Sequence, residues 1–319
     1  MHDGNARPSP APVFLAGPTA VGKSAVALTL AELLGGEIIS VDSMQVYRGL
    51  DLGTAKPTAA ERARVPHYLL DVVELDEAFD AAQFVRLATV AVKDIQARDC
   101  VPIFCGGTGL YFKAWLEGLG EAPPSDSRVR AELEAAPLAE LLVELERRDP
   151  VTYERIDRQN PRRVVRALEV IRLTGKPFSA QRAEWSSRNT KHGTRVLCLT
   201  REPADLRARI EARVDAMFAA GLVEETRALQ VRGLADNRHA MQALGYRQVV
   251  EHLRGERGLA ETVALVKTRT WQFARRQGTW FRGQMRGEPV PLTPESDPAA
   301  VANEMAVRLT TRRTVARLD

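Results

Sequence analysis

Short apolar runs alternate with amphipathic stretches over the first 120 residues of the chain. Three runs, at residues 13–16, 37–41 and 101–105, have the length of buried strands, and each is followed by Gly or Asp. Between them, residues 24–34 and 81–98 repeat their apolar positions at the spacing of a helix. Strands that alternate with helices predict βαβ units and a parallel sheet.

The alternation continues further along the chain. Residues 67–74 (HYLLDVVE) and 194–200 (TRVLCLT) are two more strand candidates, and a helical pattern follows at 203–220. We therefore expect one doubly wound α/β domain formed by residues 13–120 and 193–286.

A different pattern separates the two parts of this domain. Residues 121–192 open on a Pro- and Ser-rich segment and contain no strand signal. Leucine spacing predicts a helix at 128–148, and a proline in the first turn begins a second helix at 161–174. We expect an inserted all-helical domain. One face of its second helix carries a basic stripe made of Arg162, Arg163 and Arg166.

Composition indicates an ordinary globular protein. The 319 residues are 45% hydrophobic and 27% charged, enough for a core in one large or two modest domains. No apolar run approaches the ~20 residues of a membrane span. Residues 1–12 are polar and proline-rich and lack the apolar region of a secretory signal, so we expect a flexible tail and a cytoplasmic protein. Residues 287–319 show no interpretable pattern and are assigned to a C-terminal tail.

Cysteine spacing argues against a zinc site or a disulfide framework, because no C-x-x-C pair occurs. We expect buried thiols at Cys100, Cys105 and Cys198.

Positive charge is concentrated in two regions. Residues 153–195 hold eleven Arg or Lys against four acids, a local charge of +7 in a chain of net charge +4. Residues 262–286 hold six basic residues and no acid, with Trp and Phe between them. Each region alone could be a solvated helix face with core aromatics behind it. Two such regions in one chain favour a polyanionic partner, namely nucleic acid.

The segment GPTAVGKS fits the phosphate-loop pattern G-x-x-x-x-G-K-[ST], with a predicted strand before it and a helix after it. Backbone N–H groups and the helix N-terminus would hold phosphate oxygens, the lysine would add a positive charge, and the serine hydroxyl would face Mg²⁺. The pattern does not say whether the phosphate belongs to a nucleotide. The loop consists of Gly17, Pro18, Thr19, Ala20, Val21, Gly22, Lys23 and Ser24.

Asp42 is the best-placed general base. It follows the strand at 37–41, whose carboxyl end should lie beside the phosphate loop. The strand at 101–105, where a nucleotide hydrolase would normally carry a magnesium-binding acid, instead leads into GGTG. A turn-capping role for Asp42 is an equally open interpretation at this point.

Six blocks, in this order, resemble the tRNA dimethylallyltransferase family: GPTAVGKS, VDSMQVYRGLDLGTAKP, GGTGLYFKAWLEGL, RALEVIRLTGKP, LGYRQ and RRQGTWFR. The resemblance covers residues 13 to about 283. It implies transfer of a dimethylallyl group from dimethylallyl pyrophosphate to N6 of the adenosine 3′ of the anticodon, in tRNAs that read codons beginning with U. We also expect Mg²⁺ as cofactor, at the phosphate loop, and a monomer.

The resemblance assigns roles by position. The phosphate loop and Arg213 correspond to the pyrophosphate site, with Ser24 as metal ligand, Asp42 as the base and Thr108 beside it. Arg209 lies on the same predicted helix, so the choice of Arg213 depends on the resemblance. Trp271 departs from the basic residue common at its position. The implied tRNA contacts are Asp42, Ser43, Met44, Gln45, Thr108, Arg130, Arg162, Arg163, Arg166, Gln242, Gly245, Tyr246 and Arg247.

Two other classes use a loop of this kind. A small-molecule kinase would bind ATP there, but a kinase function does not explain why the helical insertion is basic. A nucleic-acid-binding ATPase would need an acid at a strand end that is not obvious in this sequence.

Overall fold

The computed structural model describes residues 9–181, 196–285 and 287–315 and divides the chain into two compact units. Residues 1–112 and 193–319 form the first, which we call the core unit. Residues 113–192 form the second, the helical unit.

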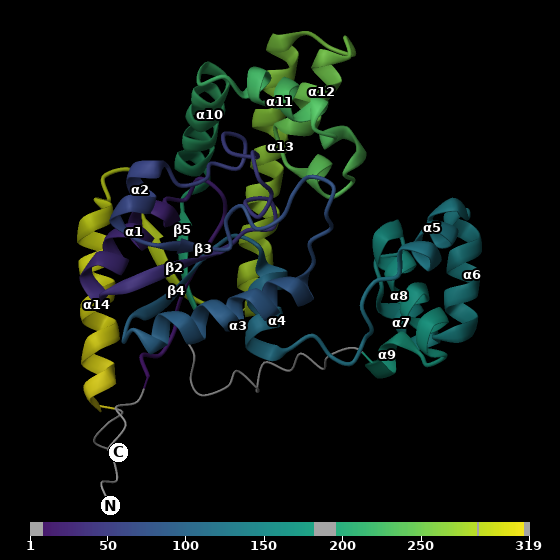
Figure 1. Ribbon diagram of the computed structural model, residues 1–319, viewed down its shortest axis with the longest axis horizontal. Helices are drawn as coiled ribbons and strands as arrows, with labels where there is room; N and C mark the ends of the chain where they lie inside the picture. The colour runs from purple at the N-terminus through teal and green to yellow at the C-terminus, as the bar shows by residue number, and fades with distance from the viewer. Residues whose placement is uncertain (1–8, 182–195, 286, 316–319) are drawn as a thin grey trace, which may run out of the picture. The chain divides into compact units, whose positions relative to one another are not determined.

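One parallel sheet of six strands lies at the centre of the core unit, in the order β3-β2-β4-β1-β5-β6 (Figure 1). This arrangement confirms the predicted α/β fold class. The strands are β1 (Val13–Ala16), β2 (Gly36–Val41), β3 (His67–Tyr68), β4 (Val101–Gly106), β5 (Val196–Arg201) and β6 (Glu288–Leu292).

The register of the middle strands determines where loops meet. β1 pairs with β4 on one side and β5 on the other, and β1, β2 and β4 are buried along their whole length. Gly106 at the end of β4 lies beside both Ala16 and Val41. The segments after β1, β2 and β4 therefore begin at one edge of the sheet, where ligands bind in open α/β folds.

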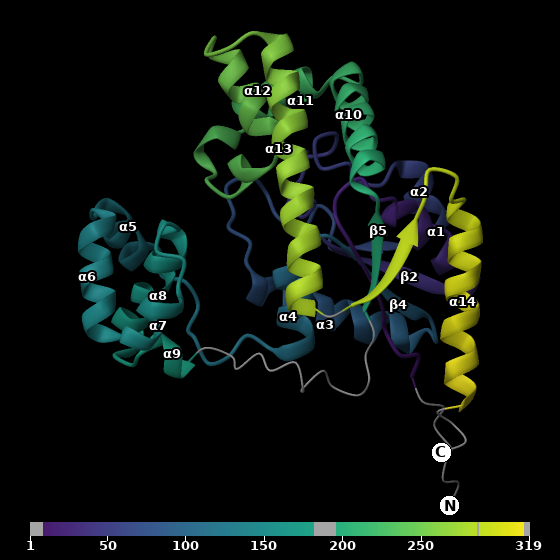
Figure 2. The same cartoon turned by 180° about the vertical axis from the view of Figure 1, so that it is seen from behind.

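Helices cover this sheet, and α13 is the longest of those described (Figure 2). Two short 3₁₀ helices lie at Leu234–Asp236 and Ala240–Gln242, and a π-helical turn lies at Phe281–Met285. The helices are α1 (Lys23–Leu34), α2 (Ala59–Arg64), α3 (Ala81–Ala97), α4 (Gly109–Glu117, which crosses into the helical unit), α10 (Pro203–Ala219), α11 (Leu222–Val231), α12 (Tyr246–Leu253), α13 (Leu259–Trp280) and α14 (Pro298–Val315).

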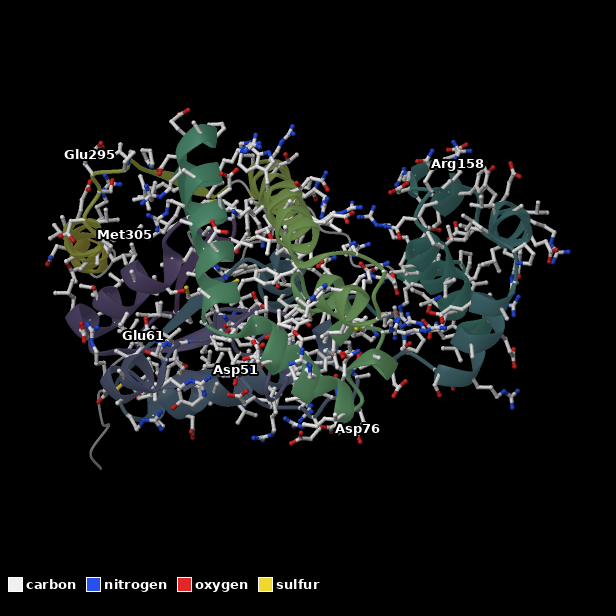
Figure 3. The ribbon with its side chains drawn as sticks, turned by 90° about the horizontal axis from the view of Figure 1, so that it is seen from above. Asp51, Glu61, Asp76, Arg158, Glu295 and Met305 are labelled. Atoms are coloured by element: carbon white, nitrogen blue, oxygen red, sulfur yellow. The ribbon has the colours of Figure 1, made fainter. Side chains whose placement is uncertain are left out.

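Two expectations for the core unit need correction. The strand predicted at 67–74 is only two residues long, because Leu69 and Asp71 take positive φ angles of 62° and 55° and interrupt the extended chain. The segment assigned to a C-terminal tail instead adds β6 to the sheet and packs α14 against α1. Met305 of α14, labelled in Figure 3, is buried in the same hydrophobic cluster as the α1 side chains.

The described part of the helical unit contains helices and no strand. The single helix expected at 128–148 is two helices that Pro137 separates. Leu133, Leu145 and Leu168 form part of a separate hydrophobic core. Residues 182–192 of the predicted insertion lie outside the described residues. The helices are α5 (Ser127–Ala135), α6 (Leu138–Arg148), α7 (Pro150–Arg155), α8 (Pro161–Thr174) and α9 (Phe178–Gln181).

Candidate active site

The phosphate loop has the conformation that its sequence predicts. Gly17 and Gly22 take φ angles of 149° and 110°, and a Cβ on Gly17 would lie 2.7 Å from the Leu199 carbonyl oxygen. The Lys23 ammonium donates to the Pro18 carbonyl at 2.7 Å and so lies across the loop. The loop leads directly into α1, whose N-terminus supplies backbone donors to an anion.

Arg213 of α10 closes a pocket over this loop. The pocket has a volume of about 190 Å³ and is lined by Ala20, Gly22, Lys23, Ser24, Ala25 and Arg213.

The structure separates the roles of the arginines of α10. Arg209 donates from Nε to the Ala20 carbonyl at 3.0 Å and therefore braces the loop from outside. Arg213 lines the pocket itself. Geometry thus distinguishes two side chains that sequence spacing could not.

The pocket holds two cations whose charged forms are disfavoured by burial. Burial lowers the pKa of Lys23 to about 8; Arg213 acts in the same direction, whereas Cys105, Asp42 and Cys198 oppose it. Burial also lowers the pKa of Arg213, which Asp42 opposes. Two cations that repel each other would both gain from an anion between them. The pocket therefore suits an anionic group.

Asp42 and Thr108 meet at the edge of the sheet beside this pocket. Asp42 Oδ1 accepts from the Met44 and Gln45 amides at 2.8 and 3.2 Å, which is the turn-capping role left open by the sequence. Within the described residues, no hydrogen bond occupies Asp42 Oδ2. Thr108 Oγ1 accepts from the Ser43 amide at 3.1 Å, and its own amide donates to Val41. One carboxylate oxygen thus fixes the loop, while the other is available to a substrate.

The side chain of Gln45 lies within the loop that follows. It accepts from the Ser40 hydroxyl at 2.8 Å and donates to the carbonyls of Thr54 and Ala55. Its side-chain amide is engaged by this loop.

A buried lysine that sequence reasoning missed holds the same loop. Lys56 Nζ donates to the Tyr47 carbonyl at 2.6 Å, to Asp51 at 2.8 Å and to Asp71 at 2.5 Å. Asp51 appears in Figure 3. In the sequence, the only sign of this structural role is the charge of Lys56 within the block GTAKP.

Tyr246, which the resemblance places among tRNA contacts, is fully buried. Its hydroxyl donates to Glu225 at 2.5 Å and accepts from the Gly53 amide at 3.0 Å. The buried side chain of Tyr246 thus supports the loop after Asp42, and its contact with tRNA stays a prediction. Among its neighbours in that prediction, Gln242 and Arg247 are exposed and Gly245 is buried.

The predicted RNA-binding arginines of the helical unit fall into two pairs. Arg162 and Arg163 are exposed at the start of α8. Arg166 and Arg130 instead bind Glu169, at 2.7 and 3.3 Å, and the side chain of Glu169 is 0% exposed. Burial raises the pKa of Glu169, but the Ser125 hydroxyl and the two arginines outweigh this and hold it below its usual value. Arg166 thus differs from Arg162 and Arg163 in being partly buried beside an internal acid, and the predicted tRNA contacts of the basic stripe stay predictions.

Gln277 of α13 is a further residue that the sequence prediction missed. It is 9% exposed and bonds both the phosphate loop and the segment before Thr108. Its position in the block RRQGTWFR was the only sequence signal.

Comparison with known proteins agrees with this geometry. A family model described as IPP transferase matches residues 45–284. A tRNA dimethylallyltransferase of Anaeromyxobacter dehalogenans is 46% identical over 300 residues, which is 93% of this chain and 99% of that protein. One of Halorhodospira halophila is 48% identical over 284 residues, covering 87% and 92%.

The chain belongs to the tRNA dimethylallyltransferase family. It is therefore an enzyme, a prenyl transferase. The tRNA isopentenylpyrophosphate transferase of Bacillus halodurans has a TM-score of 0.69 and 36% identity, covering 97% of this chain and 99% of that one. A eukaryotic dimethylallyltransferase, captured acting on tRNA, has a TM-score of 0.79 and 26% identity, covering 97% and 80%.

The described residues of this family member contain neither a metal-binding cluster nor a membrane-spanning helix. No group of three His, Cys, Asp or Glu among them could hold a metal ion. Their helices all fall short of the length and apolarity that crossing a bilayer requires.

Proposed function

We propose that this enzyme transfers the dimethylallyl group of dimethylallyl pyrophosphate to N6 of the adenosine 3′ of the anticodon, in tRNAs that read codons beginning with U, and releases pyrophosphate. The supporting observation is a phosphate pocket lined by the cations Lys23 and Arg213, together with the carboxylate of Asp42, whose Oδ1 is held by backbone amides. A small-molecule kinase does not modify an adenine amine and would therefore not need a base to accept its proton.

The residues divide the reaction between them. An exocyclic adenine amine is a poor nucleophile, so a carboxylate that accepts its proton as the C–N bond forms contributes about 10²–10⁴-fold. Asp42 is suited to this through Oδ2, because its Oδ1 is held by backbone amides. The pyrophosphate gains charge as the C–O bond breaks, and Lys23, Arg213 and the loop amides stabilise that charge.

Mg²⁺ fits this pocket only together with the substrate. The ion commonly takes one or two protein ligands plus phosphate oxygens and water. Ser24 is exposed at the pocket and offers its hydroxyl, and Asp42 is the nearest carboxylate named in the electrostatics of Lys23. When bound, the ion would neutralise charge on the pyrophosphate.

Adenine in a stacked anticodon loop must be turned out to reach Asp42, at a cost of a few kcal/mol. Phosphate contacts elsewhere on the tRNA would offset this cost. The exposed Arg162, Arg163 and Arg247 are candidates for these phosphate contacts.

A monomeric state and a cytoplasmic location stay predictions.

The test is to incubate the protein with dimethylallyl pyrophosphate, Mg²⁺ and unmodified tRNA, digest the tRNA and analyse its nucleosides by mass. The expected product is adenosine bearing a five-carbon prenyl group, at the position 3′ of the anticodon in tRNAs for U-starting codons and absent from other tRNAs. Replacing the donor by ATP is the control. Release of phosphate from ATP with no prenylated nucleoside would contradict the proposal and favour a kinase or an ATPase.

A further inference from the structure

Gln277 joins the donor half and the acceptor half of the site through a single side chain. Its Oε1 accepts from the Thr19 amide of the phosphate loop at 2.8 Å. Its Nε2 donates to the Gly107 carbonyl at 2.9 Å. Thr19 and Gly107 lie 258 and 170 residues away from Gln277 along the chain.

The two partners determine the orientation of this side chain. A backbone amide only donates and a carbonyl only accepts, so the oxygen must face Thr19 and the nitrogen must face Gly107. An uncharged amide supplies both groups at once, whereas an ionised carboxylate only accepts. The absence of a side chain at Gly107 leaves room for this contact, because a Cβ there would lie 2.4 Å from Gln277 Nε2 and would displace it.

From Gly107 the connection continues directly to the base. The next residue, Thr108, donates its amide to Val41 and accepts from the Ser43 amide. Those two residues flank Asp42. A displacement of Gly107 therefore moves both anchors of Asp42 relative to the phosphate loop.

We propose that Gln277 is a positioning residue that sets the separation between the pyrophosphate cradle and the base. The expected effects on kcat rest on the proposed function, because they are measured as prenyl transfer. Reacting groups need to be aligned closely, and a misplacement of about 1 Å can cost about 10²-fold in rate. Gln277 itself does not touch the reacting atoms, so it acts through Thr19 and Thr108.

The first test compares Gln277→Met with Gln272→Met. Gln272 is exposed on the same helix, and among the described residues only Arg269 bonds to its side chain, at 3.5 Å, so it serves as a matched control. We expect Gln277→Met to lower kcat by about 10–10²-fold, with tRNA affinity within threefold of wild type, and Gln272→Met to have the wild-type kcat. A kcat within twofold of wild type in Gln277→Met would overturn the proposal.

Gln277→Glu separates positioning from simple packing. When ionised, the introduced carboxyl keeps the Thr19 bond but places an acceptor against the Gly107 carbonyl. When protonated, it can donate to Gly107 and accept from Thr19, as glutamine does. The ratio of variant to wild-type kcat should therefore rise as the pH falls from 8 to 6. A ratio that stays flat while the variant remains folded would overturn a positioning role.

Hydrogen exchange provides a readout that needs no activity. In Gln277→Met, amides in residues 17–24 and 107–111 should both exchange faster than in Gln272→Met, since one side chain restrains both segments. Unchanged exchange in either segment would contradict the link, even if the wild-type protein fails to prenylate tRNA. Failure of the proposed function and failure of this inference are therefore distinguishable.

Discussion

The two units use arginine and lysine in different ways. In the core unit, Lys23 and Arg213 lie half-buried in one pocket with their pKa values lowered, so they are poised for an anion that the protein does not supply. In the helical unit, Arg130 and Arg166 already have an anion, the buried Glu169. Positive charge in a sequence therefore does not by itself mark a ligand site, because an internal acid can satisfy it.

The sharpest test of the core side is Asp42→Asn. Asparagine keeps an oxygen for the Met44 and Gln45 amides, so the loop should hold its shape while the base is lost. We expect kcat to fall by about 10²–10⁴-fold, with tRNA affinity within a few-fold. Single-turnover prenylation measures the first and filter binding the second. Turnover near the wild-type value would remove Asp42 from the mechanism.

Glu169→Gln tests the helical side. The change leaves Arg130 and Arg166 without their counter-ion, and breaking a buried ion cluster typically costs about 3–5 kcal/mol. Urea denaturation should show the free energy of unfolding reduced by that order, while donor binding by the core unit is retained. Stability equal to that of wild type would mean that the two arginines are available to RNA after all.

The pH dependence of donor binding examines Lys23. Its pKa of about 8 in the donor-free protein means that the amine loses its positive charge as the pH rises through 8. Affinity for dimethylallyl pyrophosphate should fall above that pH, by up to about tenfold at pH 9. Isothermal titration calorimetry with wild type and Lys23→Arg provides the comparison, because arginine stays charged. An affinity that is constant from pH 7 to 9 would contradict the assignment.

The smallest expected effect concerns the exposed arginines of α8. Arg162→Gln with Arg163→Gln should weaken tRNA binding and flatten the plot of log K against log[salt] by about 0.7–0.9 for each phosphate that the variant no longer neutralises. Arg147→Gln with Arg155→Gln removes the same charge from α6 and α7 and is the matched control. Equal salt slopes for the two double variants would show that α8 makes no specific phosphate contact.

The sequence was most informative where local chemistry determines structure. The glycines of the phosphate loop, and the strand that ends just before Asp42, have the predicted conformation because loop geometry and strand ends depend on neighbouring residues. Glu169 and Gln277 were missed because their partners lie up to 44 and 258 residues away in the chain. Helical spacing likewise placed Arg166 on α8 correctly but could not reveal the acid that it faces.

β6 was missed for a local reason. Its sequence, EPVPL, contains two prolines, which argue against a strand because proline cannot donate to a sheet ladder. Since β6 lies at the end of the strand order, only one side needs donors. Glu288, Val290 and Leu292 have the N–H groups that can donate to β5, because Pro289 and Pro291 have none.

The two edges of the sheet also affect whether molecules of this protein can associate with one another. An exposed strand with a full row of N–H groups is a template on which a second molecule can extend the sheet. Pro289 and Pro291 remove two of those groups from one end of the described sheet, and the opposite end, β3, is only two residues long. Neither border offers a continuous ladder, so a crowded solution of this protein has few places at which edge-to-edge polymerisation can begin.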